Sequence, residues 1–127
     1  MLSVVTPIYG EEDNIEPLFA ALLPVLRALG RDFEIIAVNA GSRDSSLLRL
    51  RAAAVTIPEL RIIDFRRNYG QTAAIMAAID YASGNILVPI DADLQNDPED
   101  IPALLAKLDE GYDVVSGWRQ HRKDNAF

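Results

Sequence analysis

The sequence of 127 residues has no cysteine and a single histidine, His121. The absence of cysteine excludes a disulfide framework, a thiolate zinc site and a cysteine nucleophile, and it is compatible with a reduced cytosolic setting. One histidine cannot build a histidine-rich metal centre. These two absences narrow the classes of metal site that the chain could hold.

Basic charge, long apolar runs and several common nucleotide-binding motifs are also scarce or missing. Twelve Lys and Arg residues face 19 Asp and Glu residues, a net charge of −7, which argues against nucleic-acid binding. The apolar stretches at residues 20–26 and 72–79 fall far short of the roughly 20 residues that cross a bilayer. The start of the sequence lacks the basic lead-in of a signal peptide, so we expect none. No Gly-x-Ser-x-Gly elbow, Gly-x-x-x-x-Gly-Lys loop or Gly-x-Gly-x-x-Gly turn occurs, which disfavours serine hydrolases, NTPases and dehydrogenases.

Half of the residues are hydrophobic, enough for one domain spanning residues 1–127 with a core of its own. β-Branched runs alternate with segments of helical periodicity. We expect strands at residues 2–6, 33–38, 60–64, 85–90 and 113–118, and helices at residues 15–29, 45–55, 71–82 and 101–110. Asp13 or Asn14 is placed to cap the first helix, and Pro24 to kink it. The alternation predicts an α/β fold with three layers, in which a mostly parallel sheet lies between helices.

Two carboxylates follow the strand expected at residues 85–90. Asp91 and Asp93 are two apart, so they point the same way if the extended backbone continues through Ala92. Ligands of such sheets bind beyond the carboxyl ends of the strands, which favours a Mg²⁺ or Mn²⁺ site here. The alternative is a solvated turn with a helix cap, because Asp-x-Asp alone is a common pattern.

Several segments in this order resemble family-two inverting glycosyltransferases, which have the GT-A fold. They are residues 5–15, 41–44, 67–74, 91–99 and 111–119. Their Arg-Asn-x-Gly-Gln and Asp-Ala-Asp-Leu-Gln forms are most similar to enzymes that load a sugar onto a polyprenyl phosphate, such as dolichol-phosphate mannosyltransferase. The resemblance implies a Rossmann-like GT-A domain that uses a nucleotide-diphosphate sugar, UDP- or GDP-linked.

The resemblance also implies roles for residues in the first loop. Thr6, Pro7, Tyr9 and Glu11 match the loop that surrounds the nucleoside, with Gly10 in place of the usual asparagine. Tyr9 could stack on a base. Its alternative is a half-buried aromatic anchor of the loop.

Two further loops contain residues that correspond to binding positions of the family. Asn39 begins an Asn-Ala-Gly-Ser segment where relatives typically have Asp-Asp-Gly-Ser or Asn-Asp-Gly-Ser, so Ala40 replaces the acid that resembles the base-reading carboxylate. This departure predicts altered nucleotide affinity or base choice, because alanine accepts no hydrogen bond. Arg67 matches the family arginine that could meet the diphosphate; the alternative is a solvated arginine.

The implied activity is that of a hexosyltransferase. A metal ion held by Asp93, with Asp91 on the ribose or on metal-bound water, would assist inverting transfer to a polyprenyl phosphate of the cell envelope. No general base is identified in this chain, and the resemblance places any such group beyond Phe127, in a part that a truncated domain lacks. The full-length protein is then expected in the cytoplasm, at the cytosolic face of a membrane. Two alternatives stay open: a non-catalytic binding or assembly module with an eroded nucleotide site, and a phosphoacceptor domain using Asp91.

Overall fold

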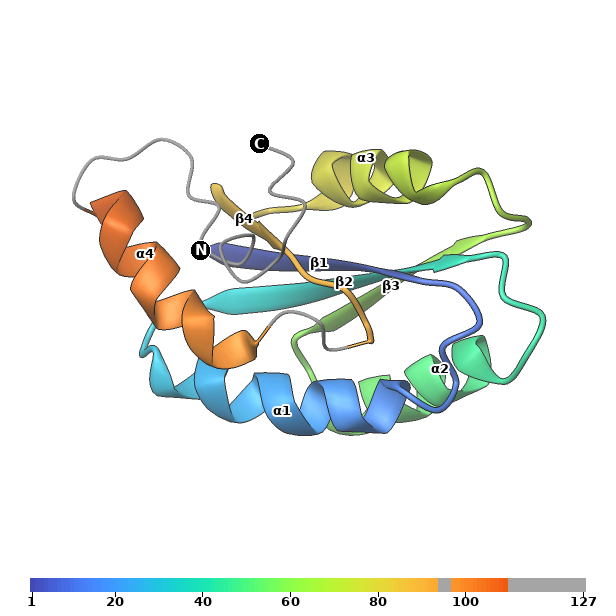
Figure 1. Cartoon of the computed structure of the whole chain (residues 1–127), viewed down its shortest axis with the longest axis horizontal. Coiled ribbons are helices and arrows are strands. Elements are labelled where there is room, and N and C mark those ends of the chain that lie inside the picture. Colours follow the sequence, from blue (N-terminus) through green and yellow to red (C-terminus); the bar gives the residue numbers. More distant parts are fainter. Residues whose placement is uncertain (94–96, 110–127) are drawn as a thin grey trace, which may run out of the picture.

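A computed structural model describes residues 1–93 and 97–109, and within these ranges the strands form one parallel sheet in the order β3-β2-β1-β4 (Figure 1). The strands are β1 (Leu2–Ile8), β2 (Phe33–Ala40), β3 (Leu60–Phe65) and β4 (Ile86–Pro89). The helices are α1 (Ile15–Ala28), α2 (Ser46–Thr56), α3 (Gln71–Tyr81), the short 3-10 helix η1 (Pro98–Asp100) and α4 (Ile101–Asp109).

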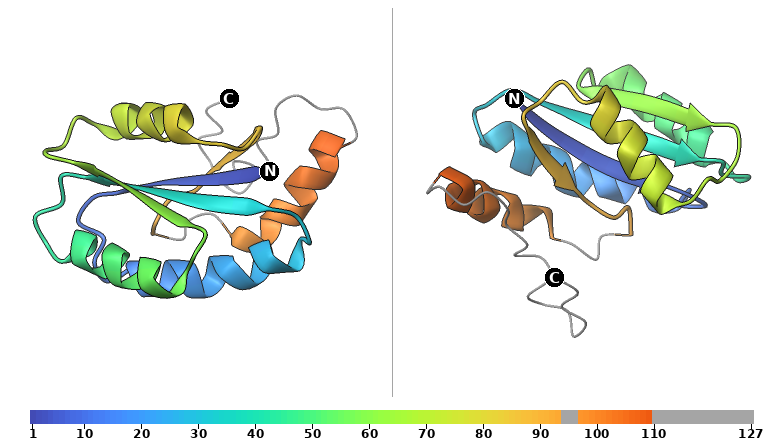
Figure 2. Two further views of the ribbon diagram at one scale, coloured as in Figure 1. Left: turned by 180° about the vertical axis from the view of Figure 1, so that it is seen from behind. Right: turned by 90° about the horizontal axis from the view of Figure 1, so that it is seen from above.

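The sheet separates two apolar cores, because successive side chains of a strand point to opposite faces. Val4 of β1 and Ile35 of β2 belong to the larger core, on the face covered by α1, α2 and α4. Val5 and Ile36 belong to the smaller core, which includes Ala74 of α3 on the opposite face. Figure 1 and Figure 2 show α3 on one side of the sheet and α1 and α2 on the other. The predicted three-layer α/β fold is therefore confirmed.

The ends of the elements differ from the expectation in small ways. Helix α1 continues through Pro24 to Ala28. Asn14, one of the two residues expected to cap α1, is its N-cap, but its side chain makes no capping bond and donates instead to Glu11 Oε2 at 2.7 Å. Strand β4 ends at Pro89, although the N–H of Ile90 still donates to the Val5 carbonyl at 2.9 Å. The strand expected at residues 113–118 lies outside the described residues.

A buried polar network closes the amino end of the sheet. The Ser3 hydroxyl donates to Glu34 Oε2 at 2.7 Å, across the β1–β2 pair. The same carboxylate oxygen accepts the N–H of Ser83 at 2.7 Å, and Ser3 Oγ accepts the N–H of Gly84 at 3.0 Å. The loop between α3 and β4 is thus tied to the two central strands, which fixes where β4 begins.

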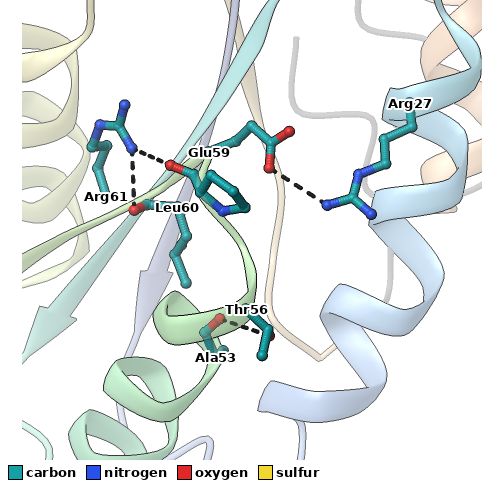
Figure 3. Close-up of polar contacts among 7 residues, drawn as sticks. Arg27, Ala53, Thr56, Glu59, Leu60 and Arg61 are labelled. Atoms are coloured by element: carbon teal, nitrogen blue, oxygen red, sulfur yellow. Dashed lines mark hydrogen bonds and ion pairs between the residues drawn. The ribbon is translucent and has the colours of Figure 1, made fainter.

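Surface contacts hold the connection from α2 to β3 (Figure 3). Arg61 Nη1 donates to the Pro58 carbonyl at 2.7 Å, and the Glu59 carboxylate forms an ion pair with Arg27 of α1 at 3.5 Å. Arg27 is about half exposed, so this pair contributes little to stability. None of the described helices is long and apolar enough to cross a membrane.

Candidate functional site

A cleft of about 460 Å³ opens at the carboxyl edge of the sheet. The carboxyl ends of β1 and β2 and the loops that follow β1, β3 and β4 contribute to its lining. The lining residues are Pro7, Tyr9, Glu11, Ala40, Asn68, Gly70, Gln71, Asp91, Ala92 and Asp93. This is the edge at which parallel α/β sheets bind their ligands.

A second hollow of similar volume lies at the opposite edge of the sheet, and it has less of the character of a binding site. Its lining includes Arg27, Arg31 and Glu59. Arg27 pairs with Glu59 at 3.5 Å, and Arg31 pairs with Asp109 at 3.6 Å. Because parallel α/β sheets bind their ligands beyond the carboxyl ends of the strands, the cleft at the carboxyl edge is the better candidate site.

Asp91 and Asp93 both line the cleft, and the residues between and before them explain why. Ile90 and Ala92 are 2% and 3% exposed and pack into the larger core. The extended backbone expected through Ala92 is not found, because residues 92–93 form a turn. Burial still alternates along residues 90–93, so Asp91 and Asp93 lie away from that core. Asp91 is partly buried and Asp93 is exposed. The two carboxylates thus share one side of the backbone and one cleft.

The donor set at this position fits a hard divalent cation only in part. Within residues 1–93 and 97–109, no group of three or more His, Asp or Glu side chains is arranged to hold a metal ion. Mg²⁺ commonly takes one or two carboxylates from the protein and completes its shell with water and substrate phosphates. Asp91 and Asp93 would suffice for a cation that arrives with a phosphorylated ligand.

The first loop brings three of its four predicted residues to the cleft. Pro7, Tyr9 and Glu11 line it, and Tyr9 is 52% exposed, which leaves ring surface open to a ligand. Thr6 is fully buried, and its hydroxyl has no hydrogen-bond partner among residues 1–93 and 97–109. It lies on the face of the sheet that carries the larger core, so its side chain does not line the cleft.

At the carboxyl end of β2, Asn39 and Ala40 differ in whether they reach the cleft. The Asn39 side chain is 2% exposed and donates through Nδ2 to Asp64 Oδ1 at 3.0 Å. Ala40, rather than Asn39, lines the cleft, so the position of the missing family carboxylate is at the site itself.

The first and second loops are joined by hydrogen bonds. The N–H of Gly10 donates to Ser42 Oγ at 3.1 Å, and the N–H of Glu11 donates to Ser46 Oγ at 3.0 Å. Ser46 in turn donates its hydroxyl, at 2.6 Å, and its N–H, at 3.0 Å, to Asp44 Oδ1. The hydroxyl bond from Ser46, followed by the backbone bond, lowers the pKa of Asp44 below its usual value. An ionised Asp44 therefore fixes the serine that holds the Glu11 backbone.

The third loop presents residues for which the sequence predicts no role in the site. Asn68, Gly70 and Gln71 line the cleft, and the N–H of Gly70 donates to Asn68 Oδ1 at 2.7 Å. Arg67 does not line it: the guanidinium carbon lies 5.0 Å from the centre of the Tyr69 ring. The signal that could have identified Asn68 and Gln71 is their position, between a strand end and a helix start at the binding edge.

Comparison with known proteins adds sequence relatives. Residues 3–127 match the model of the family described as Glycosyl transferase family 2. A glycosyltransferase from Synechocystis, named as uncharacterized, is 48% identical over 126 residues, which cover 99% of this chain and 40% of the relative. An undecaprenyl-phosphate 4-deoxy-4-formamido-L-arabinose transferase of Salmonella paratyphi B is 43% identical over 127 residues, 99% of this chain and 39% of the relative. The chain thus spans about two fifths of the length of these relatives.

Solved structures resemble the fold. Glucosyl-3-phosphoglycerate synthase from Mycobacterium tuberculosis, in complex with Mn²⁺, UDP and glucosyl-3-phosphoglycerate, is 26% identical with a TM-score of 0.67, over 85% of this chain and 39% of that one. A mannosyltransferase from Pyrobaculum calidifontis, in complex with GDP-Man and Mn²⁺, is 26% identical with a TM-score of 0.61, over 72% of this chain and 27% of that one.

Proposed function

The chain belongs to glycosyl transferase family 2, as its motifs predict, and on this basis we propose that its cleft binds a UDP- or GDP-linked sugar. We further propose that the full-length protein transfers this sugar to a polyprenyl phosphate with inversion. The observation that carries the proposal is that Asp91, Asp93 and the exposed ring of Tyr9 line one cleft at the carboxyl edge of the sheet.

Asp91 and Asp93 would hold Mg²⁺ or Mn²⁺ together with the diphosphate of the donor. Both are oxygen ligands of the kind that these cations prefer. Two similar proteins were solved with Mn²⁺ and a nucleotide or nucleotide sugar, which supports the same use here. When bound, the cation would supply charge neutralisation of the diphosphate as the nucleotide leaves.

The chain's own residues would bind and orient the nucleoside. Tyr9 offers a ring face on which a base can stack, and Pro7 and Ala40 supply apolar wall next to it. Glu11 lines the same cleft, and its carboxylate accepts Asn14 Nδ2 at 2.7 Å, which fixes its place. Thr6 and Asn39, buried behind the cleft, would support this wall rather than contact the nucleotide.

Arg67 remains a proposed partner of the diphosphate through the loop to which it belongs. It precedes Asn68, which lines the cleft, and its guanidinium now lies over Tyr69. A guanidinium pairs with phosphate in a planar, two-pronged geometry that is stronger than an exposed cation–π contact. Release from Tyr69 when a diphosphate binds is therefore energetically favourable.

A polyprenyl phosphate acceptor is supported by the Salmonella relative, whose name specifies undecaprenyl phosphate. A phosphate acceptor is already an anion, so its attack needs little help from a general base. This agrees with the expectation that no residue of this chain serves as that base. The site of action would be the cytosolic face of a membrane, where such a lipid is reached.

The second candidate is a non-catalytic binding module on the same fold. Ala40 favours it, because this residue lines the cleft at the position where relatives carry an acid and offers no acceptor to a base. Loss of a partner to a buried donor costs about 1–3 kcal/mol, roughly 5- to 140-fold in affinity.

Calorimetric titration of the full-length protein with UDP and with GDP, each with and without Mn²⁺, tests the proposal. We expect binding that requires Mn²⁺ and that is lost in Asp93→Asn. Asp32→Asn, the same change at an exposed position in the opposite hollow, should bind as the wild type does. Sugar transfer to a polyprenyl phosphate should then be lost in Asp93→Asn alone. Absence of binding by the wild type to either nucleotide would refute the enzyme proposal and support the binding module.

A further inference from the structure

Gly41 sits where the second loop of the cleft meets the third. Its φ of +77° lies in the left-handed region that side chains rarely adopt. A Cβ at this position would lie 2.4 Å from the Arg67 carbonyl carbon, 2.5 Å from the Asn68 nitrogen and 2.6 Å from the Arg67 Cα. All three are backbone atoms, so no side-chain rotation could relieve the overlap. The backbones of the two loops touch because residue 41 has no side chain.

The backbone that Gly41 touches leads directly into one wall of the cleft. Asn68, Gly70 and Gln71 form that wall, and the first of them supplies one of the contacted atoms. The next residue after Gly41 faces the other way: Ser42 Oγ accepts the N–H of Gly10, in the loop of the opposite wall. The turn at residues 41–42 therefore connects the two sides of the cleft.

We propose that Gly41 is a positioning residue of the nucleotide site, which sets the place of the Asn68–Gln71 wall by allowing the two backbones to touch. The inference rests on the proposed function insofar as the cleft binds a nucleotide. A side chain at residue 41 would push the third loop outward, since the carbonyl carbon of Arg67 would have to retreat by about 0.6 Å, from 2.4 Å to the 3.0 Å that real contacts reach. A displacement of this size in the wall of a binding site lowers affinity for the ligand, because the lining groups no longer meet the ligand atoms that they bind.

A matched pair of variants separates this effect from backbone strain. Gly30 has a φ of +70°, close to that of Gly41, but a Cβ there would meet nothing within 4 Å. Gly30→Ala and Gly41→Ala should therefore carry similar strain, and only the second should move the third loop. With Mn²⁺ present, we expect Gly41→Ala to bind UDP or GDP about tenfold more weakly than Gly30→Ala. Equal affinities of the two variants would overturn the proposal.

A second measurement needs no ligand. In the full chain, amide NMR signals of Asn68, Gly70 and Gln71 should shift in Gly41→Ala and stay in place in Gly30→Ala. If the wild type binds no nucleotide while these signals shift, the proposed function fails and the positioning of the loop stands. Signals that stay in place in both variants overturn the positioning of the loop whatever the binding result.

A third variant covers the case in which Gly41→Ala does not fold. Tyr69 braces the same loop from another side: its ring meets that of Phe65 edge-on, with centres 5.6 Å apart, and carries the Arg67 guanidinium. Tyr69 does not line the cleft, so Tyr69→Leu loosens the wall without removing a lining residue. Because Tyr69→Leu also frees the Arg67 guanidinium, the comparison is made without that arginine: Arg67→Gln/Tyr69→Leu should bind nucleotide about threefold more weakly than Arg67→Gln alone. Unchanged affinity would show that the place of this loop does not matter and would overturn the proposal.

Discussion

Replacement of Ser3 by alanine tests whether the buried network at the amino end of the sheet stabilises the fold without taking part in the site. Ser3 is fully buried, and its hydroxyl makes two bonds. It donates to the Glu34 carboxylate at 2.7 Å and accepts the N–H of Gly84 at 3.0 Å. Ser3→Ala removes both bonds and changes the side-chain volume by a single oxygen atom.

The expected loss in the free energy of unfolding depends on whether Glu34 and the N–H of Gly84 keep hydrogen-bond partners after the substitution. Glu34 keeps the N–H of Ser83 as a partner, so the carboxylate is not stranded. The N–H of Gly84 loses its acceptor, which costs about 1–3 kcal/mol when buried and less here, because Gly84 is partly exposed. A bond to a charged group adds about 1.5–3 kcal/mol of net stabilisation when present. We expect Ser3→Ala to lower the free energy of unfolding by about 2 kcal/mol.

Urea unfolding at neutral pH measures this change, with the slope against denaturant expected to stay constant. Ser83→Ala is the matched control, because Ser83 is exposed and contributes only its backbone N–H to the same network. It should change stability by less than about 0.5 kcal/mol. Nucleotide affinity should be the same in both variants, since the network lies at the end of the sheet away from the cleft. Equal stability of Ser3→Ala and Ser83→Ala would refute the reasoning.

Other predictions concern packing in the core, stability at acid pH and stacking on the nucleotide base. Leu22→Ala, at a fully buried position of α1, should cost about 2–5 kcal/mol in thermal or urea unfolding, whereas Leu48→Ala, at a residue 70% exposed, should cost less than about 0.5 kcal/mol. The lowered pKa of Asp44 means that its stabilising contribution is present above the unfolded pKa and is lost as the pH falls through the folded pKa. Ser46→Ala should raise that pKa toward 3.8 in a carboxyl NMR titration, because the Ser46 hydroxyl is the largest cause of the shift. Tyr9→Ala should weaken nucleotide binding by about 1–3 kcal/mol and Tyr9→Phe should preserve it, as calorimetry would show if the ring stacks on the base.

The fold could be predicted from the sequence because its determinants are local and periodic. Runs such as those around Val5 and Ile36 are apolar on both faces, which is typical of strands covered on two sides. Gly30, the residue directly after the helix expected at residues 15–29, has a φ of +70°, the left-handed backbone of a helix stop. Asp91 and Asp93 could be singled out because two carboxylates directly after an apolar strand are a local signal, although residues 92–93 form a turn rather than the expected extended backbone.

The arrangement of the loops could not be predicted, because it depends on contacts between segments far apart in the sequence. Nothing local to Arg67 indicates that its guanidinium lies over Tyr69 rather than in the cleft. The close approach of Gly41 to the third loop likewise depends on the packing of two loops that follow neighbouring strands. A glycine in a turn is usually explained by its positive φ alone. At Gly41 the close approach of the Arg67 and Asn68 backbone is a second reason.

The register of the sheet explains which predicted binding residues reach the cleft. Pro7 pairs with Val38, a member of the core under α3, so Pro7 faces the α3 side. Ala40 is two residues beyond Val38 and faces the same side, whereas Asn39 faces the larger core.

The same parity continues past the end of β4. Pro89 pairs with Val5 on the α3 side, and Asp91 and Asp93 follow at steps of two, while Ile90 and Ala92 pack into the larger core. The cleft is therefore built on the α3 side of the carboxyl edge, where α3 begins at Gln71. A one-residue deletion between Val88 and Asp91 would turn Asp91, the carboxylate nearest the strand, toward the larger core. Such a variant should lose metal-dependent nucleotide binding although it keeps every residue of the proposed site.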